Sequence, residues 1–250
     1  MDKISVVIIT YNEESNIARC LDSVNAIADE IVVVDSLSTD NTKSICSRYN
    51  KVRFIEHVFS GFGAQKQFAI NQAQNNWVLF IDADEQLSAE LVAEIEQLKT
   101  MGFKDGGYYV HRKTFYQGKL LNFCGMRREK HLRLFNRTLG SFTQVLVHES
   151  FETKLPCMNL KNSFFHYPYK NLEHHLQKIN SYTTLWATNK SECGVRCTKL
   201  KAIAKCCNRL FAILFIKLAI LDGMAGVIWA IMGAYYTFLK YAKLAELSDK

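Results

Sequence analysis

Proline is scarce in this chain of 250 residues, with only two, and glycine accounts for twelve. That scarcity excludes collagen-like and linker-rich proteins. The composition is 48% hydrophobic, 12% aromatic and 22% charged, and no low-complexity tract interrupts it, so a disordered or fibrous chain is excluded as well. The sequence therefore predicts a globular protein of one or two domains with a substantial core.

A charged-then-apolar leader of the signal-peptide type is also missing, because the chain begins Met-Asp-Lys-Ile and runs directly into a strand pattern. The eight cysteines are scattered through strand, helix and tail patterns. We therefore expect a reduced, cytosolic compartment.

Acidic residues are few in the last part of the chain. Residues 1–150 hold 17 Lys and Arg against 18 Asp and Glu, whereas residues 151–250 hold 14 against 6. Such a basic region can meet nucleic acid, anionic lipid or a polyanionic substrate. Nucleic acid is disfavoured, because the basic residues lie beside apolar stripes and not in an aromatic-rich platform.

Four short apolar runs, rich in β-branched residues, alternate with helical patterns in the first 105 residues; the runs are 4–9, 31–34, 52–55 and 77–81. This alternation predicts an α/β fold, with a parallel sheet and helices on both faces. A helix is expected over 87–98. The alternation then ends, and strands are expected over 106–111 and 132–135, with a basic loop between them and a helix over 172–186.

Polar residues follow three of the four runs, at the strand ends where ligands bind in such sheets. They are Thr10, Tyr11, Asn12 and Glu13, then 35–40, then Asp82, Ala83, Asp84 and Glu85. Acidic clusters that converge need a cation or strong donors, and oxygen ligands suit Mg²⁺ or Mn²⁺ held with a diphosphate. For the Asp-x-Asp tripeptide alone, a solvated turn or a helix cap is the alternative.

Taken together, these motifs resemble the nucleotide-binding half of the family 2 glycosyltransferases with the GT-A fold, over about the first 150 residues. The resemblance implies a Rossmann-like, mainly parallel sheet and a UDP-sugar donor, with residues 1–105 as the donor-binding half. It places Asp35 at the base, and Asp82 and Asp84 at the ribose, the metal and the diphosphate. The donor-binding set expected in this way is Thr10, Tyr11, Asn12, Glu13, Asp35, Ser38, Lys66, Asp82 and Ala83.

Lys66 begins a helix pattern after the glycine loop 61–63, where a cation and free backbone amides could hold phosphate. A plain surface lysine is the alternative. The basic residues Arg127, Arg128, Lys130, His131 and Arg133 are expected in the loop before the next strand, where their charge would suit phosphate.

The stretch Val147-His148-Glu149 resembles a bacterial subgroup of family 2 enzymes that build the lipopolysaccharide core. This resemblance implies that Glu149 is the general base of an inverting transfer, with residues 106–190 as the acceptor half. A strand-end salt bridge is the alternative. We interpret His166, His174 and His175 as ordinary histidines, since they lack partners at metal-site spacing.

Residues 191–250 form a basic, apolar tail. Apolar residues recur at helical spacing from Leu200 to Leu214, and Lys201, Lys205 and Arg209 run along an adjoining face, as in helices that lie on anionic lipid. The longest uncharged stretch, 223–239, falls short of the ~20 residues of a membrane span. We expect attachment to one membrane surface; burial against the catalytic domain or within a homo-oligomer is the alternative.

The function expected from the sequence is a metal-dependent inverting transfer of a single sugar to a membrane-resident saccharide. The subgroup resemblance suggests glucose from UDP-glucose, an inner-core heptose of lipopolysaccharide as acceptor, and a cytoplasmic location at the inner face of the bacterial inner membrane. Alternatives are another UDP-sugar or lipid-linked acceptor, a nucleotidyltransferase, and a non-catalytic nucleotide- or saccharide-binding module.

Overall fold

The computed structural model describes residues 2–104, 106–126, 129–143 and 150–248. The chain divides into two compact units: the first holds Met1–Arg112 and Glu129–His166, and the second holds Lys113–Arg128 and Tyr167–Lys250. The donor, acceptor and tail divisions expected from the sequence concern function, and they stay a prediction.

The first unit is built on a parallel sheet at its N-terminal side. Its strands are β1 (Ile4–Thr10), β2 (Glu30–Asp35), β3 (Val52–Glu56) and β4 (Trp77–Asp82), in the spatial order β3-β2-β1-β4. Because helices cover both faces of such a sheet, its inner strands are apolar along their whole length. The four runs expected as strands are confirmed.

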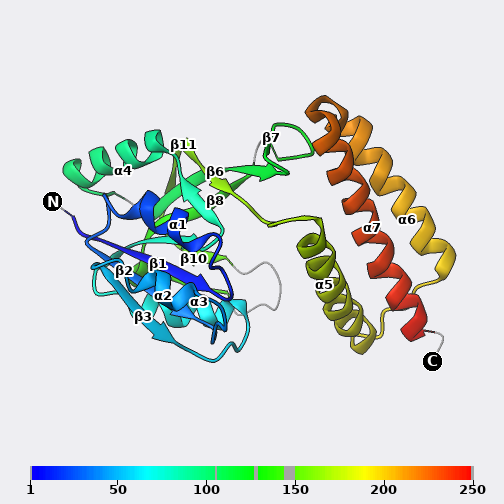
Figure 1. The fold of residues 1–250 in the computed structure, drawn as a ribbon, viewed down its shortest axis with the longest axis horizontal. Coiled ribbons are helices and arrows are strands. Elements are labelled where there is room, and N and C mark those ends of the chain that lie inside the picture. Colours follow the sequence, from blue (N-terminus) through cyan, green and yellow to red (C-terminus); the bar gives the residue numbers. More distant parts are fainter. Residues whose placement is uncertain (1, 105, 127–128, 144–149, 249–250) are drawn as a thin grey trace. The chain divides into compact units, whose positions relative to one another are not determined.

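Helices alternate with these strands: α1 (Ile17–Val24), α2 (Thr42–Cys46) and α3 (Phe62–Asn71). The buried residues of α1 share one core cluster with those of α4 (Ala89–Met101), and residues of α3 belong to a second cluster with the alternate side chains of β1 and β2. The α/β class is therefore confirmed (Figure 1).

Beyond β4 the described strand pairs are antiparallel. The sheet continues with β8 (Lys130–Asn136), β6 (Gly107–Tyr116), β11 (Cys157–His166) and β5 (Glu85–Leu87), and β7 (Lys119–Leu121) pairs with the end of β6. Two short strands, β9 (Gly140–Phe142) and β10 (Phe151–Thr153), form a separate pair. The end of the alternation near residue 105 thus marks the change from parallel to antiparallel pairing.

Two sequence expectations need correction here. The helix expected from residue 87 begins at Ala89, because Leu87 lies in β5 and the Ser88 side chain caps the helix by accepting the Leu91 N–H. The strand expected over 132–135 is longer and begins at Lys130, so Lys130 and His131 lie on β8 and not in the loop before it, and Arg133 lies within the expected strand.

The second unit is mainly helical, with α5 (Leu172–Glu192), α6 (Lys199–Phe211) and α7 (Gly223–Ser248). A π turn over Ala212–Ile216 and a 3-10 turn over Ala219–Asp222 join α6 to α7, which lie side by side (Figure 1). The buried Asp222 carboxylate accepts the backbone N–H groups of Asn122 and Phe123, at 3.0 and 2.9 Å. This carboxylate fixes the segment after β7 to the turn before α7, and the helical extension expected from the sequence is confirmed.

His175 belongs to the core of this second unit. Its Nδ1 lies 2.9 Å from the Tyr116 hydroxyl, and its ring stacks on Tyr169 with 3.6 Å between centroids. Burial lowers the pKa of His175 to about 4, and the nearby His174 and Lys178 charges add to the shift.

We therefore predict that the second unit loses stability in acid. Unfolded His175 takes up a proton near its ordinary pKa of ~6.5, whereas the folded residue does so only near 4, so the free energy of unfolding should fall as the pH drops through this window, by up to ~1.4 kcal/mol per pH unit. Urea unfolding at pH 7, 6 and 5, followed by tryptophan fluorescence, measures this. A His175→Gln variant should lack this part of the slope; an identical slope in both proteins would contradict the assignment.

Candidate active site

Hydrogen bonds between side chains and backbone connect the loops after β1 and β2. The Asn12 N–H donates to the Ser38 hydroxyl at 2.8 Å, and the Thr39 N–H donates back to the Asn12 side-chain oxygen at 2.8 Å. Asp35, at the end of β2, accepts both the N–H and the hydroxyl of Ser38. The residues expected to bind the donor base and ribose thus form one preorganised surface at the carboxyl edge of the sheet.

The individual residues of the first loop differ in exposure. Thr10 is buried at the end of β1, and its hydroxyl has no hydrogen-bond partner among the described residues. Tyr11 is 58% exposed, and Asn12 adopts a left-handed backbone conformation, with a φ of 54°. The Glu13 N–H donates to the Thr42 hydroxyl, which ties the loop to α2. An exposed aromatic ring on a fixed loop is suited to stack on a planar base.

A buried arginine holds the first carboxylate of the Asp-Ala-Asp motif. Arg133 on β8 donates from Nη2 to Asp82 Oδ2 at 2.9 Å and to Glu85 Oε1 at 2.5 Å. The Asp82 N–H in turn donates to Glu85 Oε2 at 3.0 Å. The Arg133 and Glu85 side chains are almost fully buried. Arg133 therefore bridges two carboxylates that would otherwise repel each other.

These contacts separate the protonation behaviour of the two carboxylates. Burial opposes ionisation of both, but Lys66 and Arg133 outweigh it at Asp82 and hold its pKa below the ordinary value. At Glu85, burial dominates and raises the pKa to about 7, with Arg133 opposing the shift and Asp82 adding to it. Asp82 is thus the permanently charged member of the pair.

Lys66 lies in the first turns of α3, with Nζ 3.9 Å from Asp82 Oδ1 and 5.2 Å from the centroid of the Phe80 ring. Its neighbour Gln65 is fully buried and anchors the helix by hydrogen bonds to the His57 ring and the Ser36 hydroxyl. The lysine is therefore held at the carboxylate edge of the sheet, and the surface-lysine alternative does not describe its position.

The second carboxylate of the motif faces a histidine that sequence reasoning missed. Asp84 Oδ2 lies 3.5 Å from His166 Nε2, and both side chains are largely buried. His166 reaches this place because β11 pairs antiparallel to β5, with His166 opposite Glu85. Two ligand atoms of one metal ion lie at most ~4.2 Å apart when each metal–ligand distance is ~2.1 Å, so this pair fits a shared divalent cation.

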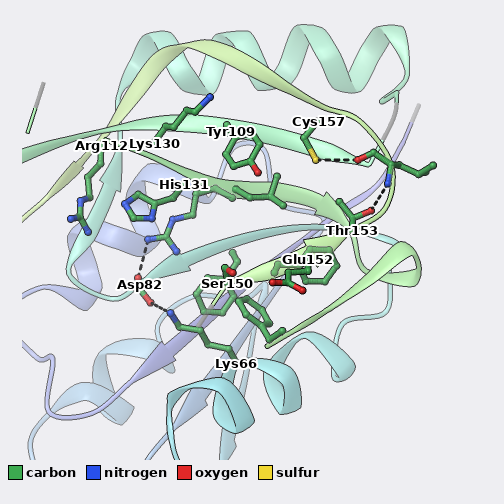
Figure 2. Close-up of a pocket in the computed structure, with 16 residues that line it drawn as sticks. Lys66, Asp82, Tyr109, Arg112, Lys130, His131, Ser150, Glu152, Thr153 and Cys157 are labelled. Atoms are coloured by element: carbon green, nitrogen blue, oxygen red, sulfur yellow. Dashed lines mark hydrogen bonds and ion pairs between the residues drawn. The ribbon is translucent and has the colours of Figure 1, made fainter. Parts of the chain in front are cut away.

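A cavity of about 790 Å³ opens beside Asp82. Figure 2 shows the Lys66 ammonium directed at the Asp82 carboxylate at one side, with Lys130, Arg112 and Tyr109 farther along the same cavity. Ser150, Glu152 and Thr153 line it from β10 and the residue before it. The cavity has room for a sugar, and it carries more basic than acidic side chains.

The remaining expected site residues are Ala83, the base Glu149 and the loop arginines. Ala83 is buried in the core, so a contact with a donor would come from its backbone. Glu149, Arg127 and Arg128 lie outside the described residues. Among the residues that are described, no group of three or more His, Cys, Asp or Glu side chains is arranged to hold a metal ion.

Comparison with known proteins decides the family. The model of glycosyl transferase family 2 matches residues 5–152. An uncharacterized glycosyltransferase of Rickettsia typhi is 33% identical over 100% of this chain and 89% of its own length. The lipopolysaccharide core biosynthesis glycosyltransferase LpsC of Rhizobium meliloti is 31% identical over 97% of this chain and 92% of its own.

This chain belongs to glycosyl transferase family 2. Solved structures overlap it only in part. Staphylococcus aureus TarS matches 45% of this chain and 22% of its own, with 29% identity and a TM-score of 0.38. Glucosyl-3-phosphoglycerate synthase of Mycobacterium tuberculosis, in complex with Mn²⁺, UDP and phosphoglyceric acid, matches 47% and 44%, with 27% identity and a TM-score of 0.35.

As a member of this family, the protein is a glycosyltransferase, and a relative of a lipopolysaccharide core enzyme. The resemblance drawn from the strand-end motifs is confirmed. The GT-A class expected from it agrees with the described sheet, in which a parallel half ends at the Asp-Ala-Asp motif and an antiparallel half follows.

We predict that removing the Arg133 guanidinium destabilises the first unit strongly. Arg133→Met leaves the buried Glu85 carboxylate without its cation and removes one of the two cations that face the partly exposed Asp82, which costs about 3–5 kcal/mol of unfolding free energy. Denaturant unfolding followed by tryptophan fluorescence measures the loss. Lys43→Met is the control, because Lys43 and its partner Glu56 are both exposed and a surface pair of this kind contributes little to stability. Equal losses in the two variants would contradict the bridge.

Proposed function

We propose that this glycosyltransferase moves a single glucose from UDP-glucose to an inner-core heptose of lipopolysaccharide, with inversion at the transferred carbon. The observation that carries the proposal is the arrangement of Asp82 with Lys66 and Arg133 at the wall of a cavity of sugar size, together with the Asp84–His166 pair of the same motif. The lipopolysaccharide context is supported by LpsC, which resembles this chain over nearly its whole length.

The donor nucleotide would lie on the loops after β1 and β2. Tyr11 presents its ring to solvent there, and Asp35 and Ser38 fix the floor of the loop. Lys66 would be the cation that contacts the diphosphate, because its side chain extends from α3 toward Asp82. Asp82, charged and aimed by Arg133, is placed to accept hydrogen bonds from donor hydroxyl groups.

The chemistry of the donor set fits a divalent cation, Mg²⁺ or Mn²⁺. Asp84 and His166 would hold it, and two protein ligands are enough when diphosphate oxygens and water complete the shell. When bound, the ion would supply positive charge to the departing diphosphate. We propose that Asp84 and His166 bind the metal, whereas Asp82 contacts Lys66, Arg133 and the donor. The sequence resemblance suggests that both aspartates bind the metal, whereas in the proposed site only Asp84 keeps that role.

Inversion requires a base on the face of the sugar opposite the leaving group. We propose Glu149 for this role, on the sequence resemblance. The base would take the proton from the attacking hydroxyl as the bond to the donor carbon forms.

The protein would work at the cytoplasmic face of the bacterial inner membrane, where a lipid-anchored acceptor is presented. The excess of basic over acidic residues after residue 150 supports this location. A different UDP-sugar or another lipid-linked saccharide would use the same groups, since none of them distinguishes one hexose from another.

We predict that Asp84→Ala and His166→Ala remove the metal dependence of donor binding. Calorimetric titration of UDP with Mn²⁺ and with EDTA should show at least tenfold tighter binding with the metal for the unmodified chain, and no gain for either variant, because each variant loses one of two ligands. His174→Ala is the matched control on α5. A full Mn²⁺ gain in both variants would place the metal elsewhere.

We predict that Glu149→Gln binds UDP normally but loses most turnover, by about 10²-fold or more, because the amide cannot accept the acceptor proton. The measurement is release of UDP from UDP-glucose with a heptose-containing acceptor. Glu152→Gln is the control, because Glu152 is a glutamate that lines the cavity and has no proposed part in proton transfer. A near-normal rate for Glu149→Gln would remove it from the mechanism.

A further inference from the structure

The α6 helix packs mainly with its small side chains. Ala202 is fully buried and Cys206 is partly buried, on the side that packs against α7. Larger residues join this packing near the end of the helix and in the turn after it, where Leu210 is partly buried and Ile213 is buried, and a Cβ added to Gly233 of α7 would lie 2.9 Å from the Ile213 Cδ1. Most of the large apolar side chains of α6 are therefore left outside this packing.

The opposite side of α6 and the turn after it carry exposed apolar side chains, and the ring centroids of Phe211 and Phe215 among them lie 5.1 Å apart. We call this set the apolar ridge: Leu200, Ile203, Phe211, Phe215, Ile216 and Leu221. Leu200 is 76% exposed and Ile216 is 70% exposed. Within the turn, Leu218 is held in a left-handed backbone conformation, with a φ of 56°, and is exposed as well. A patch of this kind on a soluble surface marks an interaction site.

The charge around the apolar ridge indicates which kind of surface the ridge contacts. From residue 193 to residue 221 the chain has six Lys and Arg and no Asp or Glu. Lys201, Lys205 and Arg209 recur every four residues along α6, beside the ridge, and all three are exposed. A cationic border around an apolar face is the pattern of helices that lie in the headgroup region of anionic lipid.

The contacts between α7, the helix that follows, and α5 argue against a membrane crossing by α7. Ala219–Ser248 is long and apolar enough to span a bilayer, with a mean hydropathy of 1.4 over an 18-residue window. Its C-terminal half, however, is tied to the polar helix α5: Lys243 Nζ donates to oxygens of Asn180, Thr183 and Thr184, at 2.7 to 2.9 Å. α5 carries polar, exposed residues along its length, so α7 could not enter hydrocarbon without breaking this packing.

We infer that the apolar ridge inserts into the headgroup and upper acyl region of an anionic phospholipid leaflet, with Lys201, Lys205 and Arg209 on the lipid phosphates. This inference deepens the membrane location proposed above by naming the surface that makes the contact. It is independent of the donor chemistry, because the ridge lies on α6 and the turn after it, away in sequence from the donor-binding residues.

The test is binding of the full chain to vesicles of phosphatidylcholine alone and of phosphatidylcholine with phosphatidylglycerol, followed by co-sedimentation. We expect binding to the anionic vesicles. The triple variant Phe211→Ser, Phe215→Ser, Ile216→Ser should bind at least ~30-fold more weakly, because three large apolar side chains no longer leave water. The triple variant Lys201→Gln, Lys205→Gln, Arg209→Gln should lose about fivefold per residue on anionic vesicles, and this loss should vanish in high salt.

Matched controls use residues of the same type elsewhere. Val58, Met101 and Leu185 are as exposed as the ridge residues, and their serine variants should bind vesicles normally. Lys104, Lys154 and Lys161 are exposed lysines of the first unit, and their glutamine variants should also bind normally. Calorimetric UDP binding, measured on every variant, confirms folding and separates failure of the lipid contact from failure of the proposed transferase.

Two results would overturn the inference. One is equal vesicle binding by the ridge variant and by its serine control. The other is a dimer of the unmodified chain in the absence of lipid, measured by light scattering, together with a ridge variant that is monomeric but binds vesicles normally. The ridge would then be an interface between two copies of the chain. A Phe215→Trp variant adds a positive criterion, because its fluorescence should be quenched by lipids brominated near the headgroup.

Discussion

The buried bridge from Arg133 to Asp82 and Glu85 is the interaction on which the site depends. Two carboxylates three residues apart would repel each other at the end of a buried strand, and a paired cation is needed to make their burial tolerable. Arg133 arrives there because β8 pairs antiparallel to β4, with Leu134 opposite Leu79. The strand that ends the parallel half of the sheet therefore also supplies the charge that fixes the motif.

A second antiparallel pair completes the arrangement. Glu85, held by Arg133, opens β5, and β5 pairs with β11 so that His166 comes to lie beside Asp84. The two aspartates of one tripeptide thus have different surroundings: Asp82 meets cations of the protein, and Asp84 meets a neutral or protonatable ring. If Asp84 and His166 hold a metal, they leave most of its coordination shell to the donor, so the cation and the nucleotide would bind as one unit.

Sequence reasoning reached the parts of this site that local pattern determines. The four apolar runs, the polar residues after them and the Asp-Ala-Asp motif are each contiguous, and the structure has them where they were expected. The pairing of His166 with Asp84 depends on the register of strands about eighty residues apart, which no local period reports. A signal for Arg133 was present, since an arginine amid Leu132, Leu134 and Phe135 on a strand requires a buried partner.

The packing of the C-terminal tail could not be predicted from local sequence pattern either. A helical repeat of apolar residues shows that α6 is amphipathic, but it does not tell which side packs on the protein. In the structure the packed side is mainly the one with small residues: Ala202 is buried, and Gly233 of α7 lies so close to Ile213 that an added Cβ would be 2.9 Å from its Cδ1. Large apolar side chains that remain in water forgo about 1.5–3 kcal/mol each. A hairpin that exposes Leu200, Phe211 and Phe215 would therefore gain stability where lipid covers its outer side, which is also where the proposed lipid-anchored acceptor would be found.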